Sequence, residues 1–331
     1  MVGPRAQGGE NGGMMRAIAG FVAAAVLVAA LPAAAQQVPD PNADATVSNP
    51  AFPAGTGPVI GVDSGHDENQ TLANNYAAFG KLFVNDGYVV TNFDDPVTPA
   101  NLAKMTVYVI AEPLNPNDPK GQPQANSTSA FTSTEIATIT AWVQGGGSLL
   151  MISDHPPYAG SLRALAASFG FQIEMFAAQK DPAAEFFSFA NGDLVPGPLT
   201  NGLPQIQTFY GGAFTAPAGA TPLLHFDPSW TMLTNGVNRP MSASDLRGAT
   251  LPFGKGRVVL LAEGGAWSAQ LAGKKQRKIG FDAPAAPGNK QFIVNVMYWL
   301  ATGKAPAPAV GTAAPAAPPA PAAQPGDDKD K

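Results

Sequence analysis

The sequence of 331 residues contains no cysteine, and this absence excludes several kinds of chemistry at once. Disulfide bonds, thiolate metal ligands and cysteine nucleophiles all need a thiol. Charge is also scarce, since charged residues make up 13% of the chain, the net charge is -5, and no basic stretch dominates. Nucleic-acid-binding domains concentrate positive charge, so we expect no nucleic acid partner. No Gly-rich loop with dinucleotide or P-loop spacing follows the first predicted strand, so we expect no nucleotide cofactor.

Long apolar runs are also few, and the clearest one lies near the N-terminus. Residues 17–31 are apolar, follow an arginine, and precede small residues at 33–35. A positive start, an apolar run shorter than the roughly 20 residues of a membrane span and an A-x-A site are typical of a secretory signal peptide. We therefore predict a signal peptide over residues 1–35, with translation starting near Met14, and a periplasmic or secreted mature protein without a membrane span. A retained membrane anchor is the alternative.

The remaining chain divides by composition into three parts. Residues 36–56 are predicted to be a loose N-terminal segment. Residues 57–303 have the apolar content to fold around a sizeable core, in a chain that is 45% hydrophobic overall, and are predicted to form one domain. Residues 304–331 are rich in Ala and Pro and then charged. They lack large apolar side chains to offset the entropy of ordering, so this tail is predicted to be disordered.

The predicted domain alternates short apolar stretches with amphipathic ones. Predicted strands cover residues 58–63, 88–93, 106–112, 148–153 and 256–263, and apolar helix faces cover residues 72–83, 136–143, 162–169 and 292–300. Thr98-Pro99 opens a further short helix, and Thr132 with Glu135 forms a capping box. This alternation predicts an α/β fold, a flavodoxin-like, doubly wound, mainly parallel sheet with helices on both faces. Residues 183–250 break the rhythm and predict an irregular, β-containing insertion.

Acidic residues stand where the apolar strands end. Four strands finish in an acid, namely Asp63, Glu112, Asp154 and Glu263. Two of the three histidines, His66 and His155, lie beside these acids, and Pro156-Pro157 follow the second histidine. The carboxyl ends of parallel strands share one edge of an open sheet, where ligands bind. We therefore predict a site at this edge, in which Asp154 and His155 serve function and are not needed for the fold.

The acids and histidines at the strand ends can be interpreted in two ways, as structural or as functional residues. An acid after a strand is often only the N-cap of the next helix. Several acids close together must instead bind a cation or share protons with each other and with the histidines. We predict Asp63, His66, Asp154 and His155 as catalytic residues, and the same four as possible ligands of a divalent metal. Glu112 and Glu263 are predicted to orient the substrate.

Other polar residues near the strand ends are weaker candidates. Ser64 could be a nucleophile beside His66, in a pattern that resembles SGNH-type esterases, although the late D-x-x-H of those enzymes is missing because no histidine follows His225. Trp267 and Gln270 follow Glu263 closely and are predicted, with Ser64, to bind a sugar-like or other polar ligand. His225 lies apart from these residues and is predicted to be structural.

Three stretches together resemble the class I glutamine amidotransferase-like superfamily, and within it a secreted bacterial branch that is distantly similar to the trehalose-utilisation-type proteins. They are residues 141–170, 254–270 and 289–303, and the resemblance covers roughly residues 57–303. It implies the fold given above. Members of the superfamily that hydrolyse glutamine place a nucleophilic Cys at a strand-to-helix elbow, and this chain has no Cys. The resemblance puts Asp154 and His155 in the place of that elbow.

Two functions remain open from the sequence. The first is an exported hydrolase of a polar small molecule or carbohydrate, based on carboxylates and histidines and with or without a metal. The second is a non-catalytic envelope module that binds a sugar-like ligand or a protein through the same edge. Close spacing of the carboxyl and imidazole groups would favour the first, and a scattered arrangement the second.

Overall fold

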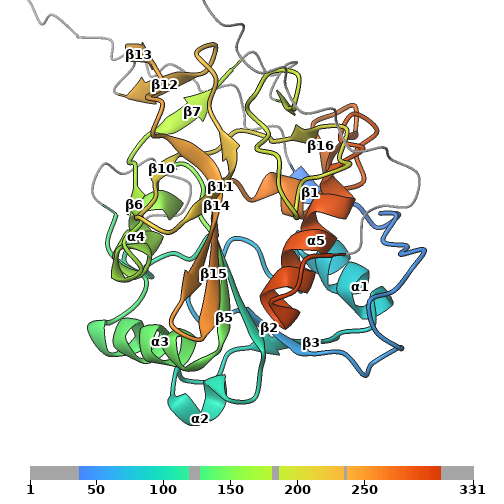
Figure 1. The fold of residues 1–331 in the computed structure, drawn as a ribbon, viewed down its shortest axis with the longest axis vertical. Coiled ribbons are helices and arrows are strands. Elements are labelled where there is room, and N and C mark those ends of the chain that lie inside the picture. Colours follow the sequence, from blue (N-terminus) through green and yellow to red (C-terminus); the bar gives the residue numbers. More distant parts are fainter. Residues whose placement is uncertain (1–36, 119–126, 181–185, 235–236, 307–331) are drawn as a thin grey trace, which may run out of the picture. The chain divides into compact units, whose positions relative to one another are not determined.

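A nine-stranded sheet forms the centre of the protein, and five of its strands are parallel neighbours (Figure 1). In spatial order, these five are β3 (Val89–Phe93), β2 (Val59–Asp63), β4 (Val107–Ala111), β5 (Ser148–Ile152) and β15 (Gly256–Leu261). Numbered along the chain, their order is 2-1-3-4-5, which is the order of flavodoxin-like sheets. In such a sheet the direction of winding reverses between β2 and β4, and a crevice opens at the carboxyl ends of these two strands.

This computed structural model describes residues 37–118, 127–180, 186–234 and 237–306. All of them belong to one compact unit. The predicted signal peptide over residues 1–35 and most of the predicted tail over residues 304–331 lie outside the described residues. Among the residues described, no helix has the length and apolar character needed to cross a membrane.

Antiparallel strands extend the sheet beyond β15. They are β14 (Leu246–Phe253), β10 (Phe214–Thr215), β6 (Gln172–Ile173) and β11 (Thr221–His225), which pairs with β14. Smaller antiparallel sheets comprise β1 (Gln37–Pro39), β16 (Ala269–Ala272) and β17 (Arg277–Gly280); β13 (Val237–Pro240), β12 (Thr231–Thr234) and β7 (Ala177–Gln179); and β8 (Phe186–Phe187) with β9 (Ile206–Gln207). The irregular β structure predicted for residues 183–250 is therefore present, largely as short antiparallel strands.

Few helices accompany these strands. They are α1 (Ala77–Asn85), α2 (Pro99–Leu102), α3 (Ser133–Gly145), α4 (Tyr158–Ser168) and α5 (Asn289–Thr302), with a 3-10 turn, η2 (Gly265–Trp267). The α2 helix starts after Thr98, whose side chain accepts a hydrogen bond from the Asn101 amide. The α3 helix starts with the predicted capping box, in which Thr132 and Glu135 satisfy each other's backbone amides. Local sequence signals fix both starting points.

Buried side chains form two hydrophobic clusters, and alternate residues of the central strands belong to different clusters. Leu150 and Ile152 of β5 lie in the cluster that includes residues of α1 and α5. Leu149 and Met151 of the same strand lie in the cluster that includes residues of α3 and α4. Successive side chains of a strand point to opposite faces, so each strand contributes to both clusters. Figure 1 shows α3 and α4 to one side of the central strands and α1 and α5 to the other.

Two local predictions differ from the structure. The first predicted helix begins at Ala77 and not at residue 72, although Tyr76 and Phe79 are buried as expected. The N-terminal segment, predicted to be loose, is held against the domain: β1 pairs with β16, and Ala45 is 2% exposed in the core. The prediction was wrong because the pairing partner of β1 lies more than 200 residues further along the chain, which no local pattern reports.

Candidate functional site

The loop after β2 brings two acids and a histidine together; we name Asp63, His66 and Glu68 the Asp63 cluster. Asp63 Oδ2 and His66 Nδ1 are 2.7 Å apart, and both Glu68 carboxylate oxygens accept a hydrogen bond from the His66 amide. One ligand-type atom from each of the three residues lies within 4.8 Å of the others. Burial and the adjacent Asp63 raise the pKa of Glu68 well above its ordinary value. The pair of acids therefore holds a proton at neutral pH when no cation replaces it.

Further residues surround the His66 ring. The ring lies 4.1 Å from the Phe131 ring, and Nε2 is 3.5 Å from Oε1 of Glu135. Burial lowers the pKa of His66, but Asp63 and Glu135 outweigh it, so the net pKa is raised. Tyr108 is fully buried beside Asp63, and its hydroxyl makes no hydrogen bond of good geometry within the described part of the chain. Glu135 thus has two roles, in the capping box and beside His66.

A second group of residues follows β5; we name Asp154 and His155 the His155 dyad. Asp154 Oδ1 accepts hydrogen bonds from both the amide and Nδ1 of His155, and Oδ2 accepts one from the Gly264 amide at 3.2 Å. The His155 side chain is 36% exposed, whereas that of Asp154 is 8% exposed. Burial lowers the pKa of His155, and Asp154 and Glu112 more than compensate, so the pKa is raised. The dyad is an oriented imidazole that reaches the surface.

Glu112, after β4, is buried behind the dyad. Its carboxylate accepts hydrogen bonds from Asn69 Nδ2 at 2.6 Å and from Gln70 Nε2 at 3.1 Å. Burial, and then the negative charge of Asp154, raise the pKa of Glu112 to about 8. Glu112 is therefore protonated at neutral pH while it lies near a carboxylate, and such pairs mark acid/base sites.

The loop over residues 66–70 connects the two groups. The Leu114 amide donates to the His66 carbonyl, and the Asn69 amide donates to the Glu112 carbonyl, both at 3.0 Å. These two bonds fix the loop against the residues that follow β4.

Three of the four described non-glycine residues with a positive φ belong to this region, and the fourth, Gln276, precedes β17. Asp67, Glu112 and Tyr210 have φ values of 57°, 54° and 69°, in the left-handed region that residues other than glycine rarely adopt. Asp67 lies in the connecting loop, and the Tyr210 ring is 5.0 Å from the His155 ring. Residues held in this region tend to cluster at functional sites.

The structure places four of the predicted site residues in two separate groups. Asp63 and His66 come together with Glu68, and Asp154 and His155 come together with Glu112. Among the described residues, only the first of these sets is spaced closely enough to hold one ion, so Asp154 and His155 do not complete a four-residue metal site with Asp63 and His66.

Three other predicted residues, Glu263, Trp267 and Gln270, make contacts within the fold. Glu263 accepts hydrogen bonds from the Ala266 and Phe209 amides and so starts the 3-10 turn. Trp267 is 1% exposed and packs among aromatic rings, and Gln270 is 1% exposed on β16. A ligand cannot reach these last two side chains in this arrangement, so their predicted role at the rim was wrong.

Two further polar residues lie outside both groups. Ser64 is half-buried, and His66 faces Asp63 rather than activating this hydroxyl. His225 bonds the Gly192 and Phe226 carbonyls, in agreement with a structural role.

Sequence reasoning missed several residues of the site. Glu68 stands two residues after His66 but was given no role, and Glu135 was assigned only to the capping box. Asn69, Gln70 and Tyr108 carry no sequence signal of their own, because their relevance depends on which side chains they face.

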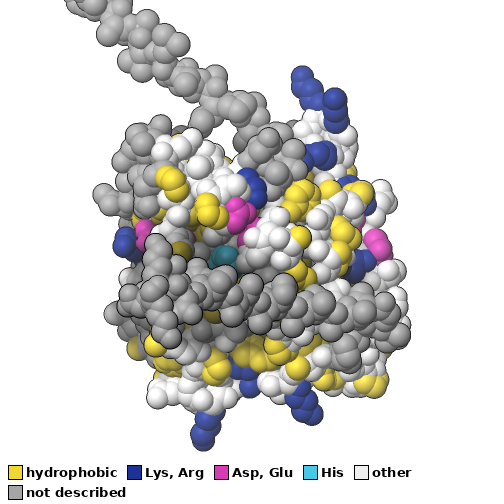
Figure 2. Space-filling model, turned by 45° about the horizontal axis from the view of Figure 1, so that its top comes forward, with side chains coloured by type: hydrophobic (Ala, Val, Ile, Leu, Met, Phe, Trp, Pro, Cys, Tyr) yellow, Lys and Arg dark blue, Asp and Glu magenta, His cyan; other side chains and the backbone are white. Residues whose placement is uncertain are grey.

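The face in Figure 2 carries few acidic and histidine side chains, which lie among hydrophobic and neutral ones.

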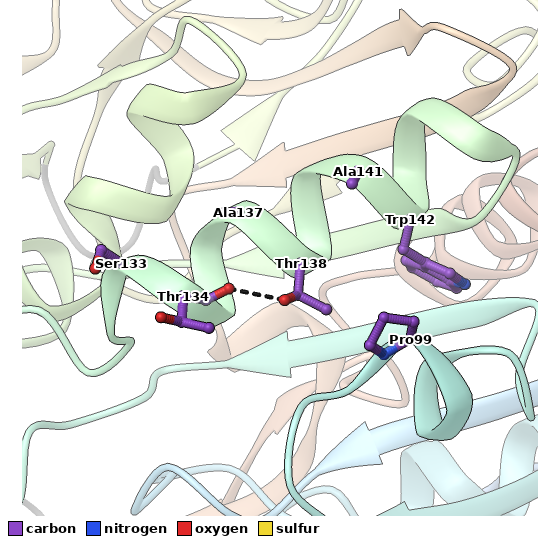
Figure 3. Close-up of a pocket in the computed structure, with 7 residues that line it drawn as sticks. All are labelled: Pro99, Ser133, Thr134, Ala137, Thr138, Ala141 and Trp142. Carbon is purple, nitrogen blue, oxygen red and sulfur yellow. Dashed lines mark hydrogen bonds between the residues drawn. The ribbon is translucent and has the colours of Figure 1, made fainter.

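A groove of about 640 Å³ lies elsewhere, between α2 and α3, and is shown in Figure 3. It is lined by Pro99, Ser133, Thr134, Ala137, Thr138, Ala141 and Trp142. None of these side chains is ionisable, so the groove offers no acid or base for catalysis.

Comparisons with known proteins support the fold alone. No protein-family model and no curated protein sequence matches this chain. Among solved structures, the mmIFT52 N-terminal domain is similar with a TM-score of 0.54 and 14% identity, over 74% of this chain and 98% of that one. ThuA-like proteins from Bacteroides uniformis and Parabacteroides merdae give TM-scores of 0.40 and 0.41 at 13% and 11% identity, and cover 76% of this chain and 94% and 92% of theirs. At such identities the likeness concerns the mixed α/β fold and says nothing of activity.

Proposed function

We propose that the protein is an exported hydrolase of a polar small molecule or carbohydrate, in which the His155 dyad performs the proton transfers. The observation that carries this proposal is the hydrogen bond from His155 Nδ1 to the buried Asp154. This bond fixes the tautomer and direction of the ring and leaves Nε2 for a substrate or water.

The reaction needs no group beyond water and these side chains. Nε2 of neutral His155 takes a proton from a water molecule while the water oxygen bonds to the electrophilic atom of the substrate. The bond to the leaving group then breaks, and Nε2–H returns the proton to that group. Asp154 stabilises the transient imidazolium. Glu112, protonated at neutral pH, keeps a second negative charge away from Asp154.

The test is a screen of the purified protein against chromogenic ester, phosphate and glycoside substrates. His155→Ala should reduce turnover by about 100-fold or more, since a general base contributes about 10²–10⁴-fold. Glu112→Gln should preserve the hydrogen-bond acceptor but change the pH profile of kcat above pH 8, where Glu112 ionises. His225→Ala is the matched control and should keep full turnover. Full turnover in His155→Ala would overturn the proposal.

A non-catalytic binding module is the second candidate, and one observation favours it. Glu112 and Asp154 are 2% and 6% exposed, so His155 and Tyr210 are the members of this site that reach the surface. Tyr210 is 39% exposed beside His155 and could stack on a sugar ring. Calorimetry with a panel of sugars on wild type and Tyr210→Ala separates the two: binding without turnover, lost in the variant, favours the module.

We propose a secreted member of the class I glutamine amidotransferase-like superfamily that lacks its Cys, with a doubly wound, flavodoxin-like sheet covered on both faces. The 2-1-3-4-5 order of the parallel strands supports this assignment. Mass spectrometry of exported protein tests the localisation: a mature N-terminus near Gln36 is expected, and an uncleaved leader would contradict it.

A further inference from the structure

A divalent-metal site is a separate function that the Asp63 cluster can perform. The group offers one imidazole nitrogen and two carboxylate oxygens within 4.8 Å of one another. Ligand atoms that share one ion at about 2.0–2.2 Å lie no more than about 4.4 Å apart. Small rotations of the side chains therefore suffice to bring all three atoms onto one ion.

The three residues come closest to one another around His66 Nδ1. His66 Nδ1 is 2.7 Å from Asp63 Oδ2 and 3.8 Å from Glu68 Oε1. Asp63 is the last residue of β2 and pairs with Phe93 of β3, and His66 and Glu68 lie in the short loop that follows. The Ser64 amide also donates to the Phe93 carbonyl at 2.9 Å, which ties the loop to β3. The ligand set is therefore held by backbone contacts that do not depend on an ion.

A fourth residue supplies an independent indication of a ligand. Tyr108 on β4 is fully buried, and its hydroxyl makes no hydrogen bond of good geometry among the described residues, although it lies within hydrogen-bonding reach of the Asp63 carboxylate. After burial, the charges of Asp63 and then Glu68 contribute most to the raised pKa of this hydroxyl, so the hydroxyl lies beside the cluster. A buried hydroxyl without a well-formed hydrogen bond is uncommon. A water molecule bound to an ion at the cluster would give this hydroxyl a partner.

The ligand types indicate which ions fit. Magnesium and calcium prefer oxygen ligands throughout, whereas imidazole suits the first-row transition metals. Glu135 lies on the far side of the ring, with its Oε1 3.5 Å from His66 Nε2. A carboxylate that faces the second ring nitrogen of a metal-bound histidine orients the ring and raises its basicity.

We propose that Asp63, His66 and Glu68 bind one divalent transition-metal ion of the Mn²⁺ or Zn²⁺ class, with Tyr108 and Glu135 as positioning residues. Three protein ligands leave coordination positions for water. The site is distinct from the His155 dyad, so this proposal goes beyond the proposed hydrolase and does not depend on it.

The experiment titrates Mn²⁺ and, separately, Zn²⁺ into the full chain after chelator treatment and dialysis. Free Mn²⁺ is followed by electron paramagnetic resonance and Zn²⁺ by calorimetry. Wild type should bind one ion per chain. His66→Ala and Glu68→Gln should each bind at least tenfold more weakly, and Tyr108→Phe about tenfold more weakly. His155→Ala is the matched control and should bind as wild type does.

A second measurement keeps the test decisive where a variant fails to fold. The chain has three histidines, so their ring signals can be followed by NMR in the wild-type protein. Mn²⁺ should broaden the His66 signals at concentrations that leave those of His155 and His225 sharp. Three results would each overturn the proposal: no saturable binding, undiminished binding in folded His66→Ala and Glu68→Gln, or first broadening at His155 or His225. Binding without any hydrolysis would leave this proposal intact and count only against the hydrolase.

Discussion

The Glu112 carboxylate fills the space that a side chain at Gly264 would need, since a Cβ atom on Gly264 would stand 1.9 Å from Glu112 Oε1. The backbone of Gly264 is held from both sides: its amide donates to Asp154 Oδ2, and its carbonyl accepts from the Tyr76 hydroxyl. These two hydrogen bonds keep the Gly264 backbone from shifting away from Glu112. Any side chain at residue 264 would therefore displace the Glu112 carboxylate.

We expect Gly264→Ala to destabilise the protein by about 1–3 kcal/mol, as is typical of overpacking in a well-filled region. The variant should also shift the pH dependence of any turnover, because Glu112 must rotate away from Asp154. Gly145→Ala is the control: nothing lies within 4 Å of its added Cβ, so stability should stay the same or rise slightly. Denaturant unfolding measures both. Equal effects of the two changes would contradict the close contact.

Asp154→Asn is expected to cost about 1–3 kcal/mol. The sequence alone suggested that this residue could be replaced without loss, but its carboxylate accepts three hydrogen bonds, from the His155 amide, the His155 ring and the Gly264 amide. An amide group in its place turns one acceptor into a donor that faces another donor. Urea unfolding of Asp154→Asn and His155→Ala compares the costs. A wild-type midpoint for Asp154→Asn would restore the original expectation.

Asp86 should make the stability depend on pH in an unusual direction. It is buried, and burial raises its pKa to about 6, against the smaller opposite effect of the hydrogen bond from the Ala51 amide. A carboxyl whose folded pKa lies above its unfolded value contributes stability below pH 4, and this contribution is lost as the pH rises through 6. Asp86→Asn should therefore gain stability relative to wild type between pH 4 and pH 7.

Thermal melts across this pH range measure the effect. The exposed Asp95 provides the control variant Asp95→Asn, in which the difference from wild type should stay small at every pH. A difference for Asp86→Asn that stays constant from pH 4 to pH 7 would refute the assignment.

Arg247→Lys should destabilise the protein by about 2 kcal/mol or more. The guanidinium is fully buried, donates to the Ala262 and Ala178 carbonyls at 3.2 Å, and lies 5.1 Å from the centres of the Phe226 and Trp230 rings. An ammonium group lacks the planar fork needed to reach both carbonyls and stack on both rings. Arg163→Lys, on the exposed side of α4, should change little. Equal midpoints for the two variants in denaturant would contradict this role.

Local signals explain what the sequence could predict. The capping box of Thr132 and Glu135 depends on residues three apart, and it is present as predicted. The order of strands and helices follows from hydrophobic periodicity, so the mixed α/β fold was accessible. The acids at the strand ends were found because parallel strands finish at a common edge.

The grouping of these acids could not be predicted in the same way. Asp63 and Asp154 belong to different groups because their strands, β2 and β5, are separated in the sheet by β4, and this order is set by long-range pairing. Trp267 was misplaced because an aromatic residue after a strand looks the same in sequence whether it faces solvent or a helix. Its neighbours Phe79 and Phe292 lie far away in the chain.

The pairing of β1 with β16 affects the order in which the chain can fold. Gln37 lies opposite Ala272, and the nearby Asp44 amide bonds Asp282, 238 residues away. β1 is the first of the described strands to be synthesised, whereas its partner β16 is synthesised only after nearly the whole domain. β1 must therefore wait as an unpaired segment, and its docking is a late, high-contact-order step that depends on the rest of the domain being formed.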